Sequence, residues 1–254
     1  MPYNLKSRNV LITGGSRGLG EVLAHTFAKE GCNIAINYFN RVEAAEDVKK
    51  AIVEKYGINA CVVKGDASVT AECKRSVEEA TSQLGGLDIV IANAGWTKFT
   101  EFSDLNAMNE DEWDKCWAAN VKGPLALLKA AKPTFNANPE GGVFLISSSI
   151  AAVSQGGSSM AYAVTKAAQV QLMKCLASTQ GPKIRINAVL PGLLLTEWGL
   201  RYPPEKIEFM KNLAVLKHET DLQDCADVFV MLAKNTSMTG MKVQIDAGLN
   251  IQGS

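Results

Sequence analysis

The sequence predicts an α/β protein with a doubly wound parallel sheet of about seven strands. Short apolar runs rich in β-branched residues alternate along the chain with stretches whose apolar residues recur at helical spacing. Strands that are apolar throughout, each followed by a helix, are typical of a parallel sheet covered on both faces. Right-handed crossovers between such strands give the doubly wound arrangement. Because no repeat or linker interrupts the pattern, we expect residues 1–254 to form a single domain.

The first half of the chain contains four of the predicted strands. They are the apolar runs at 9–13, 33–37, 60–66 and 87–95. Amphipathic patterns after the first three predict helices at 18–30, 41–56 and 69–84. Gly31 and Gly57 follow the first two helices directly, as is common at helix C-termini.

The second half continues the alternation less regularly. Strands are predicted at 142–149, 183–192 and 242–248. Helices are predicted at 111–132 and 162–179. The segment 193–215 is irregular, because it contains two prolines and is long for a plain connection.

Composition excludes several classes of function. Lys and Arg number 26, as do Asp and Glu, so the basic surface that nucleic-acid binding requires is not expected. No apolar run reaches the roughly 18 residues needed to span a bilayer, and the N-terminus enters a strand without room for a signal peptide. The six cysteines are scattered and the two histidines, His25 and His218, are isolated. We therefore expect a cytoplasmic protein without a metal site or membrane association.

The loop TGGSRGLG at 13–20 joins the first strand to the first helix and is typical of a dinucleotide-binding site. Its glycines permit a tight turn and a close approach of the backbone to phosphate, and the following helix N-terminus favours an anion. Glycines also simply form turns, but the strand–loop–helix context favours binding. We assign to the cofactor Gly14, Ser16, Arg17, Gly18, Leu19 and Gly20.

The end of the second strand predicts which dinucleotide binds. A site that prefers NAD places a carboxylate there for the ribose hydroxyls, whereas this chain has INYFNR, with Tyr38 and no acid. Arg41 follows closely, and Arg17 is a second cation whose guanidinium geometry suits a 2′-phosphate. The alternative interpretation is that both arginines lie on the surface and contact only solvent. We favour NADP(H) as the cofactor.

A cluster of hydroxyls after the fifth strand is followed by a tyrosine and a lysine. Tyr162 and Lys166 are four residues apart on one helix face, and Ser149 lies 13 residues before the tyrosine. Reduction of a carbonyl by hydride needs a proton donor for the developing alkoxide, which a phenol beside an ammonium can supply. Ser149 can donate a hydrogen bond to the reacting oxygen. The structural alternative is that Tyr162 packs, Lys166 extends to solvent and Ser149 caps a turn.

Together these motifs resemble the short-chain dehydrogenase/reductase family over essentially the whole chain. The resemblance is carried by TGGSRGLG, NAG at 93–95, Ser149, YAVTK at 162–166 and PG at 191–192. It implies a Rossmann-type fold, a small substrate lid at 193–215 and a catalytic set of Ser149, Tyr162, Lys166 and Asn120. The family's serine lies about 13 residues before its tyrosine, which selects Ser149 over Ser147 and Ser148. Asn120, in WAANVKG, matches the helix asparagine that is thought to hold a water in a proton relay to the lysine.

The same resemblance implies further cofactor contacts and an oligomeric state. The residues that match the family's cofactor contacts are Asp66, Asn93, Ala94, Gly95, Tyr162, Lys166, Pro191, Gly192 and Thr196. Members of the family commonly form homotetramers through the helices after the fourth and fifth strands, so a tetramer or dimer is expected. The family's C-terminal DGG is DAG here, at 246–248, a departure that we expect to affect only packing.

The substrate is only broadly indicated. Besides Ser149 and Tyr162, we expect Trp96, Ile150, Leu193 and Trp198 at the mouth of the substrate pocket. These apolar side chains favour a hydrophobic ketone or 3-oxoacyl group over a free sugar, and an imine or enone would fit the same geometry. The expected activity is NADPH-dependent reduction of such a carbonyl. The alternative is a non-catalytic NADP-binding sensor or scaffold protein on the same fold.

Overall fold

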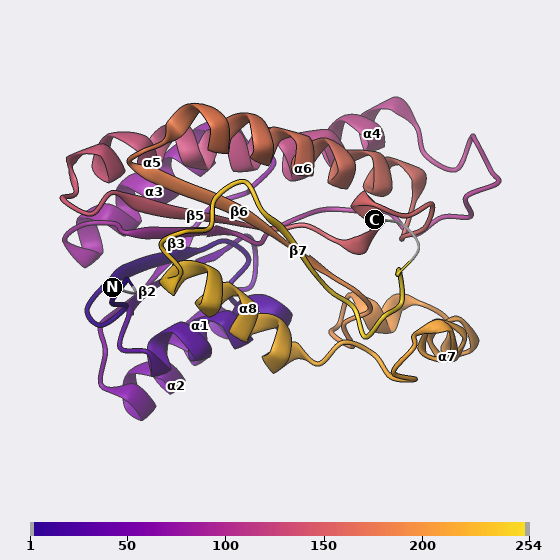
Figure 1. Cartoon of the computed structure of the whole chain (residues 1–254), viewed down its shortest axis with the longest axis horizontal. Helices are drawn as coiled ribbons and strands as arrows, with labels where there is room; N and C mark the ends of the chain where they lie inside the picture. Colours follow the sequence, from indigo (N-terminus) through magenta and orange to yellow (C-terminus); the bar gives the residue numbers. More distant parts are fainter. Residues whose placement is uncertain (1–2, 252–254) are drawn as a thin grey trace.

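The computed structural model describes residues 3–251 and contains one sheet of seven parallel strands (Figure 1). The strand order is β3-β2-β1-β4-β5-β6-β7, which confirms the doubly wound fold. The strands are β1 (Asn9–Ile12), β2 (Asn33–Tyr38), β3 (Ala60–Lys64), β4 (Ile89–Ala92), β5 (Gly142–Ser147), β6 (Ile184–Pro191) and β7 (Lys242–Ile245). The predicted domain of residues 1–254 also includes 1–2 and 252–254, which lie outside the described residues.

Eight α-helices in the described part of the chain cover the two faces of the sheet (Figure 1). On one face lie α1 (Gly18–Lys29), α2 (Val42–Tyr56) and α8 (Leu222–Lys234). On the other lie α3 (Thr70–Leu84), α4 (Glu110–Trp117), α5 (Gly123–Ala137) and α6 (Met160–Gln180). The last, α7 (Pro204–Leu213), lies apart from the sheet at one end of the molecule. Between residues 3 and 251, no helix is long and apolar enough to cross a membrane.

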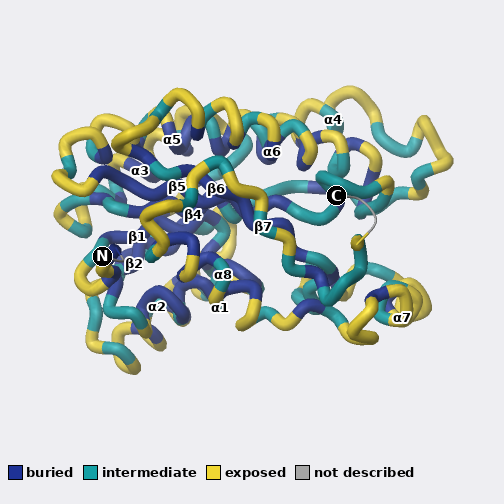
Figure 2. The backbone as a smooth tube through the Cα atoms, in the orientation of Figure 1, coloured by how far each residue is buried: buried dark blue, intermediate teal, exposed yellow. Residues whose placement is uncertain are grey.

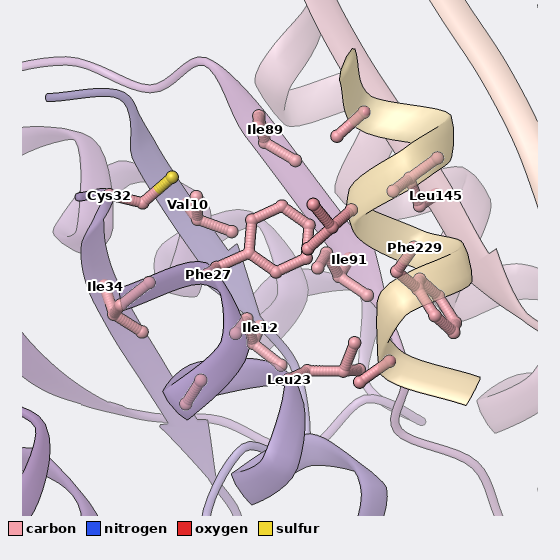
Figure 3. Packing of buried hydrophobic residues seen from close by; sticks show 14 of the residues in the cluster. Val10, Ile12, Leu23, Phe27, Cys32, Ile34, Ile89, Ile91, Leu145 and Phe229 are labelled. Atoms are coloured by element: carbon pink, nitrogen blue, oxygen red, sulfur yellow. The ribbon is translucent and has the colours of Figure 1, made fainter. Parts of the chain in front are cut away.

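Each face of the sheet has its own hydrophobic core. Because side chains alternate along a strand, Val10 and Ile12 of β1 pack under α1 and α8, whereas Leu11 belongs to the opposite core. Figure 3 shows Phe27 of α1 beside Val10 and Ile91 of the sheet, with Phe229 of α8 in the same cluster. The central strands β1, β4 and β5 are buried along their whole length, whereas exposed residues lie on the outer helix surfaces, in loops and on the edge strands (Figure 2). Burial on both faces explains why the central strands are largely apolar.

Outside the segment 193–215, two helical regions differ from the prediction. No helix was predicted before β7, yet α8 forms there, capped by the Asp221 carboxylate, which accepts from the N–H groups of Gln223 and Asp224. The predicted helix 111–132 is divided into α4 and α5 by a π-helical turn, Ala118–Lys122, and extends to Ala137. Pro124 has no N–H for the carbonyl four residues before it, so the regular α-helical pattern is interrupted there.

Several predicted strands extend too far at their carboxyl ends. Residues 93–95, 148–149 and 192 were placed in strands but leave the sheet. The segment 193–215 (the predicted lid), in which no helix was predicted, contains α7 and a short 3₁₀ helix, Gly199–Arg201. These departures from the sheet all line one cleft, so the predicted strand ends belong to the candidate site.

Replacement of Phe229 by alanine tests whether α8 is an integral part of the core. Phe229 is fully buried, and its loss should lower the free energy of unfolding by about 3–5 kcal/mol. Met231→Ala is the matched control, because Met231 is 40% exposed on the same helix. Urea denaturation measures both variants, and equal losses would contradict the packing described here.

Candidate active site

A cleft of about 1060 Å³ opens at the carboxyl edge of the sheet. Crossovers from β1 and β4 go to opposite faces there, which is where doubly wound sheets bind ligands. The cleft is lined by every predicted site residue except Asn120, namely Gly14, Ser16, Arg17, Gly18, Leu19, Gly20, Tyr38, Arg41, Asp66, Asn93, Ala94, Gly95, Trp96, Ser149, Ile150, Tyr162, Lys166, Pro191, Gly192, Leu193, Thr196 and Trp198. The structure thus brings together segments from the whole length of the chain.

The glycine loop is held against the end of β4. The Asn93 side chain donates to the carbonyls of Thr13 and Gly14, at 3.0 and 3.4 Å. The Thr13 hydroxyl accepts from the backbone N–H groups of Asn93 and Ala94, both at 3.0 Å. A Cβ on Gly20 would overlap the Gly14 carbonyl oxygen, so only glycine permits this close packing of α1 on the loop. The loop is therefore held in place between the end of β4 and the start of α1, at one side of the cleft.

The two arginines predicted to recognise a 2′-phosphate meet at one carboxylate. The Glu197 oxygens lie 2.8 Å from Arg17 Nη1 and 2.9 Å from Arg41 Nη1. All three side chains are about half exposed. Hydrogen bonding with Arg41 is the main cause that holds the pKa of Glu197 below its usual value. Two guanidinium groups therefore already converge on an oxyanion at the cleft, although the anion here belongs to the lid.

Two other predicted cofactor contacts have internal partners. Asp66 accepts from the Ser68 N–H and hydroxyl, at 2.8 and 2.7 Å, so its carboxylate stabilises the turn after β3 while lining the cleft. The Thr196 hydroxyl accepts from the N–H groups of Trp198 and Gly199 at the start of the lid. Both structural roles are compatible with a ligand contact, because each oxygen can form more than one hydrogen bond.

Lys166 is buried at the floor of the cleft. Its side chain donates from Nζ to the Ser147 carbonyl at 2.8 Å and to Gln169 Oε1 at 3.3 Å. Nζ lies 5.4 Å from the centroid of the Tyr162 ring. Burial lowers the pKa of Lys166 to about 8, because a charged amine loses hydration there.

Tyr162 stands in the first turn of α6, where the Ser159 side chain caps the helix by accepting from the Tyr162 N–H. Burial raises the pKa of the Tyr162 phenol well above its usual value, and hydrogen bonding with the Ser149 side chain acts in the opposite direction. Ser149 also accepts from the Ala151 N–H at 3.1 Å. The capping role that the sequence left open for Ser149 is therefore present together with its contact to the phenol.

Asn120 lies behind the wall of the cleft and is fully buried. Its side chain pairs with the backbone of Trp96, accepting from the N–H at 2.9 Å and donating to the carbonyl at 3.0 Å. It also donates to the Thr165 hydroxyl at 3.0 Å. Its backbone carbonyl accepts from the side chain of Gln169 at 2.8 Å. The Asn120 side chain therefore positions the segment after β4.

Aromatic residues line the end of the cleft beside Tyr162. The Trp198 ring lies 5.9 Å from the Tyr162 ring and 6.5 Å from Phe99, which stacks edge-on against Tyr202 at 4.8 Å. Tyr202, like Phe102 and Phe209, lines the cleft but was not predicted as a site residue. In the sequence, these three residues were marked only by their aromatic side chains, which lie after β4 or within the segment 193–215. No local pattern predicts that such side chains point into the cleft.

The glycine loop, the buried Lys166 amine and the Tyr162 phenol lie in one cleft of a doubly wound sheet. This combination is typical of the nucleotide-dependent oxidoreductases as a class. A family model described as Enoyl-(Acyl carrier protein) reductase matches residues 14–250. A putative ketoacyl reductase of granaticin polyketide synthase from Streptomyces violaceoruber is 31% identical, with 95% of each chain covered. The chain therefore belongs to the short-chain dehydrogenase/reductase family.

Other relatives agree with this assignment. The 3-oxoacyl-[acyl-carrier-protein] reductase of Staphylococcus aureus is 30% identical, with 96% of this chain and 98% of the relative covered. The crystal structure of a short-chain dehydrogenase from Burkholderia cenocepacia in complex with NADP has a TM-score of 0.89. The two sequences are 27% identical, and the match covers 98% of this chain and 100% of the Burkholderia chain.

Gly20→Ala tests the packing of the glycine loop. The added Cβ overlaps the Gly14 carbonyl, so the loop must shift, and stability should fall by about 1–3 kcal/mol. NADPH binding, followed by nicotinamide fluorescence, should weaken at least tenfold. Gly156→Ala is the control in the same cleft, because only the Ser154 hydroxyl lies within 4 Å of its added Cβ. Unchanged NADPH affinity in folded Gly20→Ala would show that the loop does not form the site.

Proposed function

We propose that the protein is an NADP(H)-dependent oxidoreductase that reduces a hydrophobic ketone or 3-oxoacyl group. One observation carries the proposal. The glycine loop, the two arginines and the Ser149–Tyr162–Lys166 group line the same cleft. A nucleotide held by the first set would present its far end to the second, so that binding and proton transfer occur in one space.

The residues of the cleft fit an NADP(H) molecule. The loop at 14–20 would hold the pyrophosphate, and Arg17 and Arg41 would hold the 2′-phosphate in place of Glu197. Thr196 lies against Gly18 at the start of the lid, where it would border the nicotinamide side. The NADP complex of the Burkholderia relative supports this choice of cofactor.

The chemistry of this chain is proton transfer and orientation. When bound, the nicotinamide supplies the hydride. Tyr162 donates its phenolic proton to the carbonyl oxygen as that oxygen gains negative charge, and the raised pKa keeps the phenol protonated beforehand. Ser149 donates a hydrogen bond to the same oxygen. The Lys166 ammonium stabilises the phenolate that remains, and Asn120 fixes the wall of the cleft through Trp96.

The substrate class follows from the apolar end of the cleft. Trp96, Ile150, Leu193 and Trp198 line it, and the segment 193–215 would close over the substrate as a lid. The two curated relatives described above are named as ketoacyl and 3-oxoacyl reductases, which supports a 3-oxoacyl group. The name of the family model favours testing an enoyl compound as well.

We further propose a cytoplasmic homo-oligomer, a tetramer or dimer. Val164 and Ala167 are exposed on α6, although much of that helix packs on the sheet, and would contribute to an interface between copies. All six cysteines are free, including the exposed Cys175, which suits a reducing compartment. Light scattering after gel filtration measures the assembly.

Tyr162→Phe tests the reaction itself. NADPH oxidation is followed by nicotinamide absorbance with a panel of ketones, 3-oxoacyl thioesters, enones and imines. The variant should bind NADPH as the parent does but turn over about 100-fold or more slowly, because the proton donor is lost. If the parent binds NADPH but no member of the panel oxidises it, the alternative of an NADP-binding sensor is favoured. The Ser149–Tyr162–Lys166 group would then have no catalytic role.

Arg17→Ala and Glu197→Gln test the choice of cofactor by opposite effects. Loss of Arg17 should raise the Kd for NADPH about tenfold and leave that for NADH nearly unchanged, because only NADPH has a 2′-phosphate. Loss of the Glu197 charge should lower the Kd for NADPH, since a competing anion is removed. Equal effects on both nucleotides, measured by fluorescence titration, would show that the arginines do not recognise the phosphate.

A further inference from the structure

Gln169 is a fully buried polar residue that joins two parts of the site. It lies on α6, less than one turn after Lys166, and its side chain is 0% exposed. Its Oε1 accepts from Lys166 Nζ at 3.3 Å, and its Nε2 donates to the Asn120 carbonyl at 2.8 Å. A buried amide of this kind is costly unless both ends are bonded, and here both are.

The orientation of this amide is fixed by its two partners. An ammonium can only donate hydrogen bonds, so the group beside Lys166 must be the amide oxygen. A carbonyl can only accept, so the group beside Asn120 must be the amide nitrogen. A flipped amide would lose both bonds in a site closed to solvent. Gln169 therefore holds one conformation.

The Asn120 carbonyl is available because of the local helix chemistry. Its regular partner would be the N–H of residue 124, which is a proline. The chain widens into the π-helical turn Ala118–Lys122, in which the Gly123 N–H bonds to the Ala118 carbonyl. Pro124 thus leaves an acceptor at Asn120, and the Gln169 side chain occupies it.

We propose that Gln169 is a positioning residue for Lys166, which ties the ammonium to the π-helical turn so that it points at Tyr162. The inference rests on the proposed function, which it deepens. Of the three ammonium N–H groups, one is bonded to the Ser147 carbonyl and one to Gln169. The third remains for the cleft, so the two bonds fix its direction. The other end of the amide donates to the Asn120 carbonyl, so the ammonium is tied to the π-helical turn.

The protonation of Lys166 depends on few neighbouring groups. The Cys116 thiol of α4 and the Tyr162 phenol of α6 are the titratable groups that face it, and Tyr202 from the lid acts on the phenol. Burial lowers the pKa of Lys166 and so favours the neutral amine. The Gln169 oxygen accepts a hydrogen bond from the ammonium, and a hydrogen bond to the charged form favours that form. Loss of that hydrogen bond should therefore make the amine easier to deprotonate.

The experiment compares two replacements of similar size and opposite chemistry in the full-length protein. Gln169→Met removes the oxygen that accepts a hydrogen bond from Lys166 Nζ, whereas Gln169→Glu keeps an oxygen acceptor there. Gln171→Met is the matched control, because Gln171 is exposed on the same helix. The readouts are the pH profile of kcat/KM and the NMR titration of the Lys166 ¹³Cε resonance, assigned with Lys166→Met. Circular dichroism confirms folding, and Gln169→Leu replaces the methionine variant if that variant does not fold.

In Gln169→Met, the pKa of Lys166 measured by NMR should fall by about one unit. The pKa that defines the alkaline limb of the kcat/KM profile should fall by the same amount. At pH 8 turnover then decreases about fivefold, with KM little changed. In Gln169→Glu, the pKa of Lys166 and the pKa of the alkaline limb should stay at or above the parental values. An unchanged titration in folded Gln169→Met, or an equal fall in both variants, would overturn the inference. The NMR titration needs no substrate, so it still decides the role of Gln169 if the parent oxidises no NADPH.

Discussion

Parallel pairing of β4 with β1 is the constraint on which the rest of the molecule depends. The chain builds outward from β1 to β3 and then returns to place β4 on the other side of β1. The loops after these two strands therefore go to opposite faces and leave a crevice between them. The Thr13 hydroxyl bonds the two strand ends to each other, so the glycine loop and the segment 93–95 form one rigid wall.

Burial of one amine organises the other side of the crevice. Lys166 is only 3% exposed and is stabilised by two oxygen acceptors rather than by a carboxylate. The same lack of water lowers its pKa and raises that of Tyr162. Opposite shifts in adjacent groups are typical of sites that transfer protons, and they keep the phenol protonated until charge develops beside it.

The start of the segment 193–215 connects three parts of the cleft through three consecutive residues. Thr196 lies against Gly18, Glu197 pairs with the two arginines, and Trp198 packs near Tyr162. One short turn therefore joins the glycine loop, the two arginines and the aromatic end of the cleft.

The sequence by itself determined the doubly wound fold, the glycine loop and the Tyr162–Lys166 pair, because apolar periodicity and i, i+4 spacing are local properties of the chain. The tertiary structure decided the rest. It revealed α8, whose helix was not predicted between the last two strands, and showed that the predicted strand ends at 93–95 and 148–149 leave the sheet. It also brought Glu197 to Arg17 and Gln169 to the Asn120 carbonyl, partners separated by 180 and 49 residues. Such contacts depend on how distant elements pack, which no local pattern encodes.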